Sequence, residues 1–228
     1  MAIKPNAVFG RDNLEASDDP VVDCKACPRL VMYLSSIIPR KAFKGRGGWH
    51  RPVPDFGDPE ASLLIVGLAP GAMGASRTGV PFMGDKAGVL LYSALSAAGF
   101  SSKSDVLDYS PDLRLTGCMI TNACHCAPPE NKPNRQEFEN CRPFLIKRLR
   151  MPMLKDVLCV GRAAFEQVSN ALGFKEGSFS HGAQFRVKNL NVYCTYHTSG
   201  YNQSTKRITK EAVVEILLRI RAGEGVNQ

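Results

Sequence analysis

Three apolar runs of the sequence are followed directly by polar side chains that can do chemistry. Asp85 closes a glycine-rich loop after SLLIVGL (62–68), Asn122 ends CMITNA (118–123), and His197 ends LNVYCTYH (190–197). A histidine can donate a hydrogen bond to an oxygen that gains negative charge, and a buried amide needs partners for its carbonyl and NH2 groups. Taken singly, Asp85 is better explained as a helix cap and His197 as a structural residue.

The elements that must position these side chains follow one rhythm. Four short apolar runs (the three above and DVLCVG, 156–161) alternate with helical segments expected near 86–98, 136–150, 162–172 and 205–221. This order predicts a three-layer α/β/α sandwich with a central four-stranded parallel sheet, in a single domain spanning 1–228. Residues 1–23 are expected to be an extended N-terminal segment and residues 222–228 a loose tail. Because ligands bind beyond the carboxyl ends of parallel strands, the polar residues should meet at one edge.

The loop 67–79 brings many small residues to the first strand end. Its backbone N–H groups could approach a planar ring or a phosphate closely, although a tight strand-to-helix turn explains the glycines equally well. The loop is neither GxGxxG nor a Walker A sequence, which argues against the use of nucleoside triphosphates.

The cysteines offer a second site. Cys24 and Cys27 form a CxxC before an amphipathic segment, RLVMYLSSII, and two widely separated candidates, Cys126 and Cys141, follow. Four thiolates could hold zinc or an iron-sulfur cluster; one close pair plus two separate cysteines favours the cluster. Cys124 competes with Cys126 as a ligand. The remaining three, in apolar runs, are expected in the core: Cys118, Cys159 and Cys194.

The charge indicates a polyanionic partner. The 228 residues carry a net charge of +8, and the pI is about 9.1. Lys and Arg release counterions when they bind a phosphate backbone. Residues 39–60 are expected to be a basic surface loop. No apolar run reaches the roughly 20 residues needed to cross a bilayer, and the N-terminus lacks a signal peptide's apolar stretch. We therefore expect a cytoplasmic, nucleoid-associated protein without a membrane partner.

Six segments together resemble the signature motifs of the uracil-DNA glycosylase superfamily, specifically the type 5 (B-type) enzymes. They are GLAPGAMGASRTGVPFMGD (67–85), ITNACHCAPPENKP (120–133), HTSGYNQSTKRIT (197–209), CKACPRL, RPVPDFGDP and FSHGA. The resemblance runs from about Cys24 to Thr209. It implies a monofunctional hydrolase that removes uracil, and other deaminated bases such as hypoxanthine, from double- or single-stranded DNA, starting base excision repair. We expect it to act as a monomer.

The resemblance also implies roles for individual residues. The expected 4Fe-4S ligands are Cys24, Cys27, Cys126 and Cys141. Asp85 and Asn131 would position the attacking water, and His197 would stabilise the departing base. The base would be held by Gly67, Ala69, Pro70, Gly71, Ala72, Met73, Phe82, Asn122 and Asn202. The DNA around it would be contacted by Tyr201, Gln203, Lys206 and Arg207.

Three residues depart from the family pattern. Met73 stands where His is expected, Ser76 where Asn is expected, and Thr198 where Pro is expected. The first two could reshape the base pocket, and the third could loosen the turn that carries His197. These departures keep two other hypotheses open: a non-catalytic iron-sulfur reader of damaged or single-stranded DNA, and an enzyme whose main substrate is a deaminated purine. An iron-sulfur electron carrier is disfavoured, because it would leave the pocket residues and the basic loops without a purpose.

Overall fold

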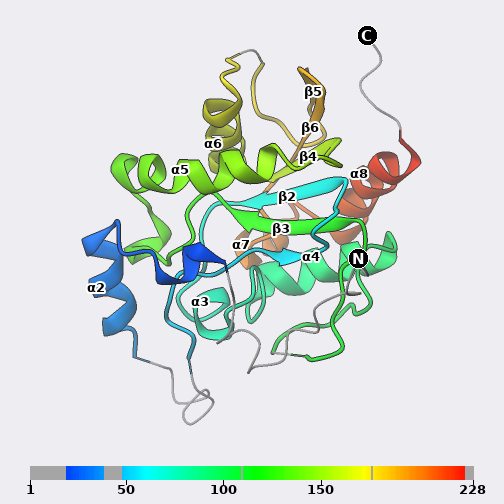
Figure 1. Cartoon of the computed structure of the whole chain (residues 1–228). Coiled ribbons are helices and arrows are strands. Elements are labelled where there is room, and N and C mark those ends of the chain that lie inside the picture. Colours follow the sequence, from blue (N-terminus) through cyan, green and yellow to red (C-terminus); the bar gives the residue numbers. More distant parts are fainter. Residues whose placement is uncertain (1–18, 39–47, 109, 176, 224–228) are drawn as a thin grey trace, which may run out of the picture.

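A six-stranded sheet forms the centre of the computed structural model, which describes residues 19–38, 48–108, 110–175 and 177–223 (Figure 1). Its strands are β1 (Phe56–Gly57), β2 (Leu63–Gly67), β3 (Cys118–Asn122), β4 (Asp156–Val160), β5 (Gln184–Val187) and β6 (Leu190–Thr195). They are arranged in the order β1-β3-β2-β4-β6-β5. The four inner strands are parallel.

The four inner strands confirm the predicted parallel core, but the sheet is larger than the predicted four strands. β1 and β5 pair antiparallel with β3 and β6, one at each edge. β1 has only two residues and follows a proline-rich stretch, and β5 is only partly buried, so neither shows the continuous apolar run that marks a doubly covered strand. The inner strands are continuous apolar runs because helices cover both of their faces.

Two pairs of helices cover the sheet. α4 (Lys86–Ala97) and α8 (Lys210–Ala222) pack on one face around Tyr92, Leu95 and Leu217. α5 (Arg135–Leu149) and α6 (Arg162–Leu172) pack on the other face, around Leu145 and Phe165. Figure 1 shows α5 and α6 above the sheet and α4 below it. Cys118, Cys159 and Cys194 are fully buried, as expected.

The N-terminal part adds a third, smaller apolar cluster beside α5. α2 (Pro28–Ser36) contributes the buried Leu30 and Leu34, which pack with Cys27, Cys126 and Cys141. The expectation of an extended segment over 1–23 is wrong for its last residues. Pro20–Asp23 form a short 3-10 helix, η1, since Asp19 caps it and Val21 and Val22 are buried; residues 1–18 lie outside the described residues.

Three other predicted boundaries shift. The helix expected over 205–221 begins later, as α8 after the N-cap Thr209, and a short helix that was not expected, α7 (Gly200–Ser204), precedes it. The expected tail begins later, because Ala222 ends α8 and Gly223 caps it; residues 224–228 lie outside the described residues. Of the expected loop 39–60, residues 39–47 are likewise outside, and the rest contains β1.

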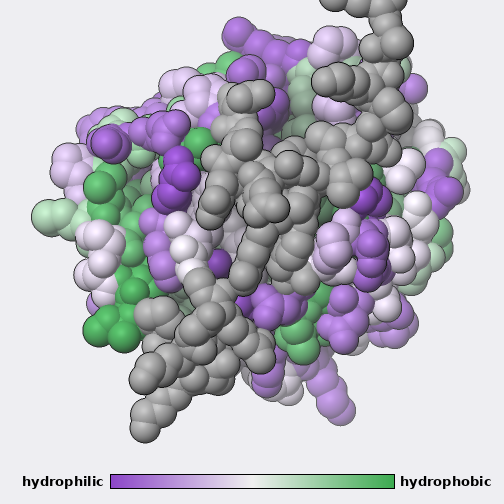
Figure 2. All heavy atoms as spheres, turned by 60° about the horizontal axis from the view of Figure 1, so that its bottom comes forward, coloured by the Kyte–Doolittle hydropathy of each residue, from purple (hydrophilic) through white to green (hydrophobic). Residues whose placement is uncertain are grey.

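The surface view in Figure 2 shows mostly hydrophilic residues with a column of hydrophobic ones on the side where α2 lies. Met32, on α2, is 67% exposed, and Ile38, two residues after the end of α2, is 83% exposed. None of the described helices has the length and apolarity needed to cross a membrane.

Candidate active site

A cavity of about 510 Å³ lies beyond the carboxyl ends of the parallel strands. Residues from four separate loops line it: Leu68, Ala69, Pro70, Gly71 and Ala75 after β2; Phe82, Asp85, Lys86 and Ala87 around the start of α4; Asn122 and Asn131 after β3; His197, Ser199 and Gly200 after β6. Asp85, Asn122, Asn131 and His197 therefore meet at one edge of the sheet as expected, whereas Asn202, the third amide expected there, does not line the cavity.

Asp85 is the N-cap residue of α4. Its Oδ1 accepts a hydrogen bond of 3.0 Å from the backbone N–H of Gly88, so one oxygen is used for capping. Its Oδ2 faces the glycine loop: a Cβ on Gly74 would lie 2.7 Å from it, and one on Gly71 would lie 3.3 Å away. Burial raises the pKa of the Asp85 carboxyl, and the backbone N–H groups of α4 and the nearby His197 act against this shift. The cap and the catalytic hypothesis are thus compatible, because they use different oxygens.

His197 follows β6 in a turn that fixes its ring. The backbone N–H of Ser199 donates to Nδ1 at 3.1 Å, so in the neutral ring the proton is on Nε2. Burial lowers the pKa of His197, with the Asp85 charge opposing the shift, and the ring is neutral at pH 7. A neutral Nε2–H is a hydrogen-bond donor that needs no counter-charge.

Side-chain amides hold the same turn. Asn202 Nδ2 donates to the His197 carbonyl at 2.8 Å, and Gln203 Nε2 donates to the Thr198 carbonyl at 2.6 Å and to the Lys86 carbonyl at 2.9 Å. The turn is therefore fastened at Thr198 although the expected proline is missing. Gln203 also joins the two walls of the cavity, the start of α4 and the turn after β6.

The floor of the cavity depends on Gly67. A Cβ there would lie 2.4 Å from Asn122 Oδ1 and 2.7 Å from the ring of Phe82, so only glycine lets both side chains come this close. Phe82 has a left-handed backbone, with φ of 59°, and its ring centroid lies 6.3 Å from that of His197. A bulky residue in that conformation is strained, and such strain clusters at functional sites.

Asn131 reaches the cavity from a second strained segment. Glu130 and Asn131, in the short 3-10 helix η3 (Pro129–Asn131), have φ of 55° and 56°. Asn tolerates the left-handed region better than most residues, and Glu does not.

Several expected base-contacting residues are placed elsewhere. Asn202 fastens the His197 turn, as described, and Ala72 packs against the N-terminal cluster of cysteines. The Met73 carbonyl accepts a hydrogen bond from Arg77, and neither Met73 nor Ala72 is among the residues that line the cavity. Ser76 is fully buried, with no partner for its hydroxyl among the described residues.

None of the four expected DNA-contacting residues lines the cavity itself. Tyr201 is 74% exposed, and Lys206 and Arg207 are exposed in the segment between α7 and α8. The guanidinium of Arg207 stacks 4.4 Å from the ring centroid of Tyr196, the residue before His197. The ring holds this charge in place beside the site.

Six residues that line the cavity are not among the predicted site residues: Leu68, Ala75, Lys86, Ala87, Ser199 and Gly200. Their places in the glycine-rich loop, directly after Asp85 and shortly after His197 were the available signal. A Cβ on Gly200 would lie 3.1 Å from the Lys86 chain, so this glycine lets the two walls approach each other.

The cysteines lie in a separate small cavity. Cys24, Cys27, Cys126 and Cys141 all line it, together with His125 and Asn140. Asn140 Nδ2 donates to Cys27 Sγ at 3.4 Å, whereas the fully buried Cys124 is turned to the Cys126 carbonyl. Among the described residues, no group of three or more His, Cys, Asp or Glu side chains is arranged to hold a metal ion. The donor set suits an iron-sulfur cluster, since four thiols from two distant segments share one cavity.

Known proteins match the chain over most of its length. Residues 54–221 match the family described as the uracil DNA glycosylase superfamily. A type-5 uracil-DNA glycosylase of Thermus thermophilus is 40% identical over 217 residues, which cover 93% of this chain and 99% of the relative. One of Pyrobaculum aerophilum is 37% identical, covering 90% and 91%. A type-4 uracil-DNA glycosylase of Sulfurisphaera tokodaii is 26% identical, covering 88% and 81%. The chain belongs to the uracil-DNA glycosylase superfamily and is similar to its type-5 members.

Proposed function

We propose that this protein hydrolyses the N-glycosidic bond of uracil in DNA. The observation that carries the proposal is that Asp85 and His197, which lie far apart in the sequence, line one cavity together with Asn122 and Asn131. A nucleobase in a duplex cannot reach such a cavity, so the target nucleotide must first leave the stack. That step costs a few kcal/mol and is easiest at a mispair or in a single strand.

His197 acts on the leaving group. As the bond breaks, negative charge grows on an oxygen of the base, and the neutral Nε2–H donates a hydrogen bond to it. The Ser199 N–H keeps the proton on this nitrogen. Asn122, which is 3% exposed at the strand end, offers its amide to the edge of the base. Backbone N–H groups of the loop 68–73 assist.

Asp85 and Asn131 act on the sugar. The ionised Asp85 stabilises the positive charge that develops on the sugar, and its Oδ2 holds a water that Asn131 also contacts. This water adds to the anomeric carbon, and the product is an abasic site. Because Asp85 must be ionised, its raised pKa limits activity at low pH.

The DNA around the flipped nucleotide is held by exposed side chains at the cavity mouth. Lys206 and Arg207 bind flanking phosphates, and Lys86 reaches the same strand from the other wall. Tyr201 fills the space that the nucleotide leaves, because Gln203 is already bonded to the Thr198 and Lys86 carbonyls. We propose that the protein works as a monomer at the nucleoid.

The base range includes other deaminated bases such as hypoxanthine. The glycine and alanine lining of the loop after β2 leaves room around the base, which supports a broader range than uracil alone. Ser76 and Met73, which lie beside that loop, tune this range.

Cys24, Cys27, Cys126 and Cys141 would hold a 4Fe-4S cluster. The cluster would supply a covalent cross-link between the N-terminal CxxC and the segments around α5, and would take no part in bond cleavage. The shared cavity of the four thiols supports this assignment.

The test uses labelled oligonucleotides that contain uracil opposite guanine, uracil in a single strand, or hypoxanthine. We expect release of free base and an abasic site, with strand cleavage only after alkali. Binding without base release contradicts the hydrolase, and strand breaks without alkali, with a borohydride-trapped adduct at Lys86, contradict a monofunctional enzyme. Gel filtration tests the monomer.

A further inference from the structure

The segment that carries Asn131 is held from outside by the N-terminal part of the chain. Its backbone has two consecutive left-handed residues, Glu130 and Asn131, which by themselves favour other conformations. Local backbone hydrogen bonds are few: the Asn131 N–H donates to the Pro128 carbonyl at 3.2 Å, and the Lys132 N–H donates to the Pro129 carbonyl at 3.0 Å. Something else must keep the segment in this shape.

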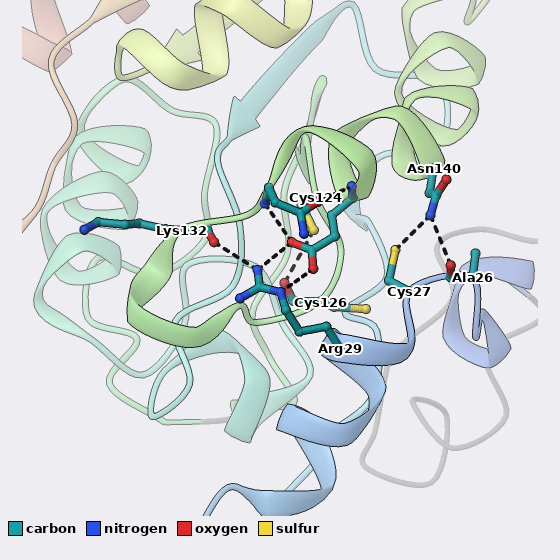
Figure 3. A network of polar contacts seen from close by, with 9 residues as sticks. Ala26, Cys27, Arg29, Cys124, Cys126, Lys132 and Asn140 are labelled. Atoms are coloured by element: carbon teal, nitrogen blue, oxygen red, sulfur yellow. Dashed lines mark hydrogen bonds and ion pairs between the residues drawn. The ribbon is translucent and has the colours of Figure 1, made fainter.

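That partner is Arg29 on α2 (Figure 3). Its Nε and one Nη donate to the two carboxylate oxygens of Glu137 at 2.7 and 2.8 Å, and the same Nη donates to the Lys132 carbonyl at 3.2 Å. Lys132 is the residue after Asn131. A planar guanidinium can serve both acceptors at once because its donors form a rigid fork.

Glu137 fixes the fork in turn. It is 3% exposed and belongs to the capping box of α5, in which its carboxylate also accepts the Asn134 N–H at 2.8 Å. The carboxylate therefore joins α2, the start of α5 and, through Arg29, the segment of Asn131. A second contact, from Asn140 to Ala26 and Cys27, attaches the CxxC to α5 independently of Arg29.

We propose that Arg29 is a positioning residue that sets Asn131 for its catalytic task, an inference that rests on the proposed function. Arg29 is not among the residues that line the cavity, so it acts through Asn131 alone. A misplacement of about 1 Å at a reacting group can lower a rate by about a hundredfold. The loss of Arg29 therefore affects catalysis more than DNA binding or overall stability.

The experiment combines Arg29→Met with Asn131→Ala in a double-mutant cycle. Single-turnover base release by Arg29→Met should fall by about ten- to a hundredfold, while the Kd for the abasic product duplex stays within about twofold. Arg29→Lys keeps the charge but not the fork, and should lose activity to an intermediate degree. In the Asn131→Ala background, Arg29→Met should change the rate by less than about twofold.

The matched control is Arg135→Met. Arg135 is also near the start of α5, but its side chain is 92% exposed and pairs with Glu139 at 2.8 Å, one helical turn further along α5. Its activity should be that of the wild type. Equal rate losses from Arg29→Met with and without Asn131, or no loss at all, overturn the proposal.

Hydrogen exchange provides a readout that does not depend on activity. In Arg29→Met, the amides of Glu130, Asn131 and Lys132 should exchange faster, while the amides of β2 and β3 should be unchanged. Unchanged exchange at these three amides, or faster exchange throughout the protein, also overturns the proposal. A wild-type protein that releases no base refutes the proposed function, whereas the exchange result still decides whether Arg29 holds this segment.

Discussion

The cavity at the strand ends and the cysteine-rich corner, formed by α2, the four cysteines Cys24, Cys27, Cys126 and Cys141 and the start of α5, shift the pKa values of their buried carboxyl groups in opposite ways. In the cavity, burial raises the pKa of Asp85 and lowers that of His197, so both are held where their charged forms are disfavoured. In the corner, burial also acts to raise the pKa of Glu137, but hydrogen bonds from Arg29 and Asn134 outweigh it and the pKa is lowered.

The backbone shows a related contrast. Phe82 and Asn131, both on the cavity, are left-handed, whereas α2 beside the cysteines is an ordinary helix that begins at a proline. Unfavourable conformations and charge states persist only where surrounding structure imposes them. The cavity therefore contains the residues whose backbone conformations and charge states are unfavourable, and the hydrogen bonds of the cysteine-rich corner hold one of them, Asn131, in its conformation.

The largest effect should come from removing the carboxylate in the cavity. Asp85→Ala should lower the single-turnover rate on a uracil-guanine duplex by about 10²- to 10⁴-fold, the usual contribution of a group that handles the reacting water. Asp156→Asn is the control. Burial also raises the pKa of the Asp156 carboxyl, but Asp156 is the first residue of β4 and lies at the opposite end of that strand from the cavity. A near-normal rate for Asp85→Ala removes the catalytic role assigned here.

The next effect should come from the donor to the base. His197→Leu should lower the same rate by about 10²- to 10³-fold, since one preorganised donor is lost. The Kd for an abasic product duplex, which lacks the base, should change little. If product binding weakens as much as the rate falls, His197 serves DNA binding and not the departing base.

Removing one cysteine of the cysteine-rich corner should lower the thermal stability of the protein. Cys126→Ser should abolish visible absorption from bound iron and lower the Tm by on the order of 10 °C, because binding of a metal group is linked to folding. Cys118→Ala, at the buried first residue of β3, should keep the absorption. An intact, colourless and fully active wild-type protein contradicts the cluster.

The smallest effect separates stability from function at Asp85. A carboxyl with a raised pKa in the folded state stabilises the protein only when protonated, so this contribution is present below pH 3.8 and is lost as pH rises through the folded pKa. Asp85→Asn keeps a capping side chain and removes this loss. It should therefore melt slightly higher than the wild type at pH 7, with the difference vanishing below pH 3.8. A lower Tm at pH 7 shows that the carboxylate is stabilising in its place.

Sequence patterns predicted the parts of the molecule that local composition determines. The four inner strands were predictable because doubly covered strands are continuous apolar runs. The meeting of Asp85 with His197 followed because the loop after one parallel strand carries Asp85 and the turn after another carries His197. The strands β1 and β5 could not be predicted from the sequence, since they are short and half-covered. The Arg29–Glu137 pair could not be predicted either, because its partners lie 108 residues apart and no local signal links them. The left-handed backbone of Phe82 likewise depends on tertiary packing that its neighbours in the sequence do not indicate.

The two antiparallel strands at the margins of the sheet have a consequence for crowding. Parallel inner strands would offer long rows of unpaired N–H and C=O groups to a neighbouring molecule, a known route to aggregation. β1 covers one margin with only two residues, and β5 covers the other with an exposed Arg186, followed by Lys188 in a left-handed turn. Within the described part of the chain, neither margin offers a long flat strand, so many copies can gather on one polyanion without pairing through their sheets.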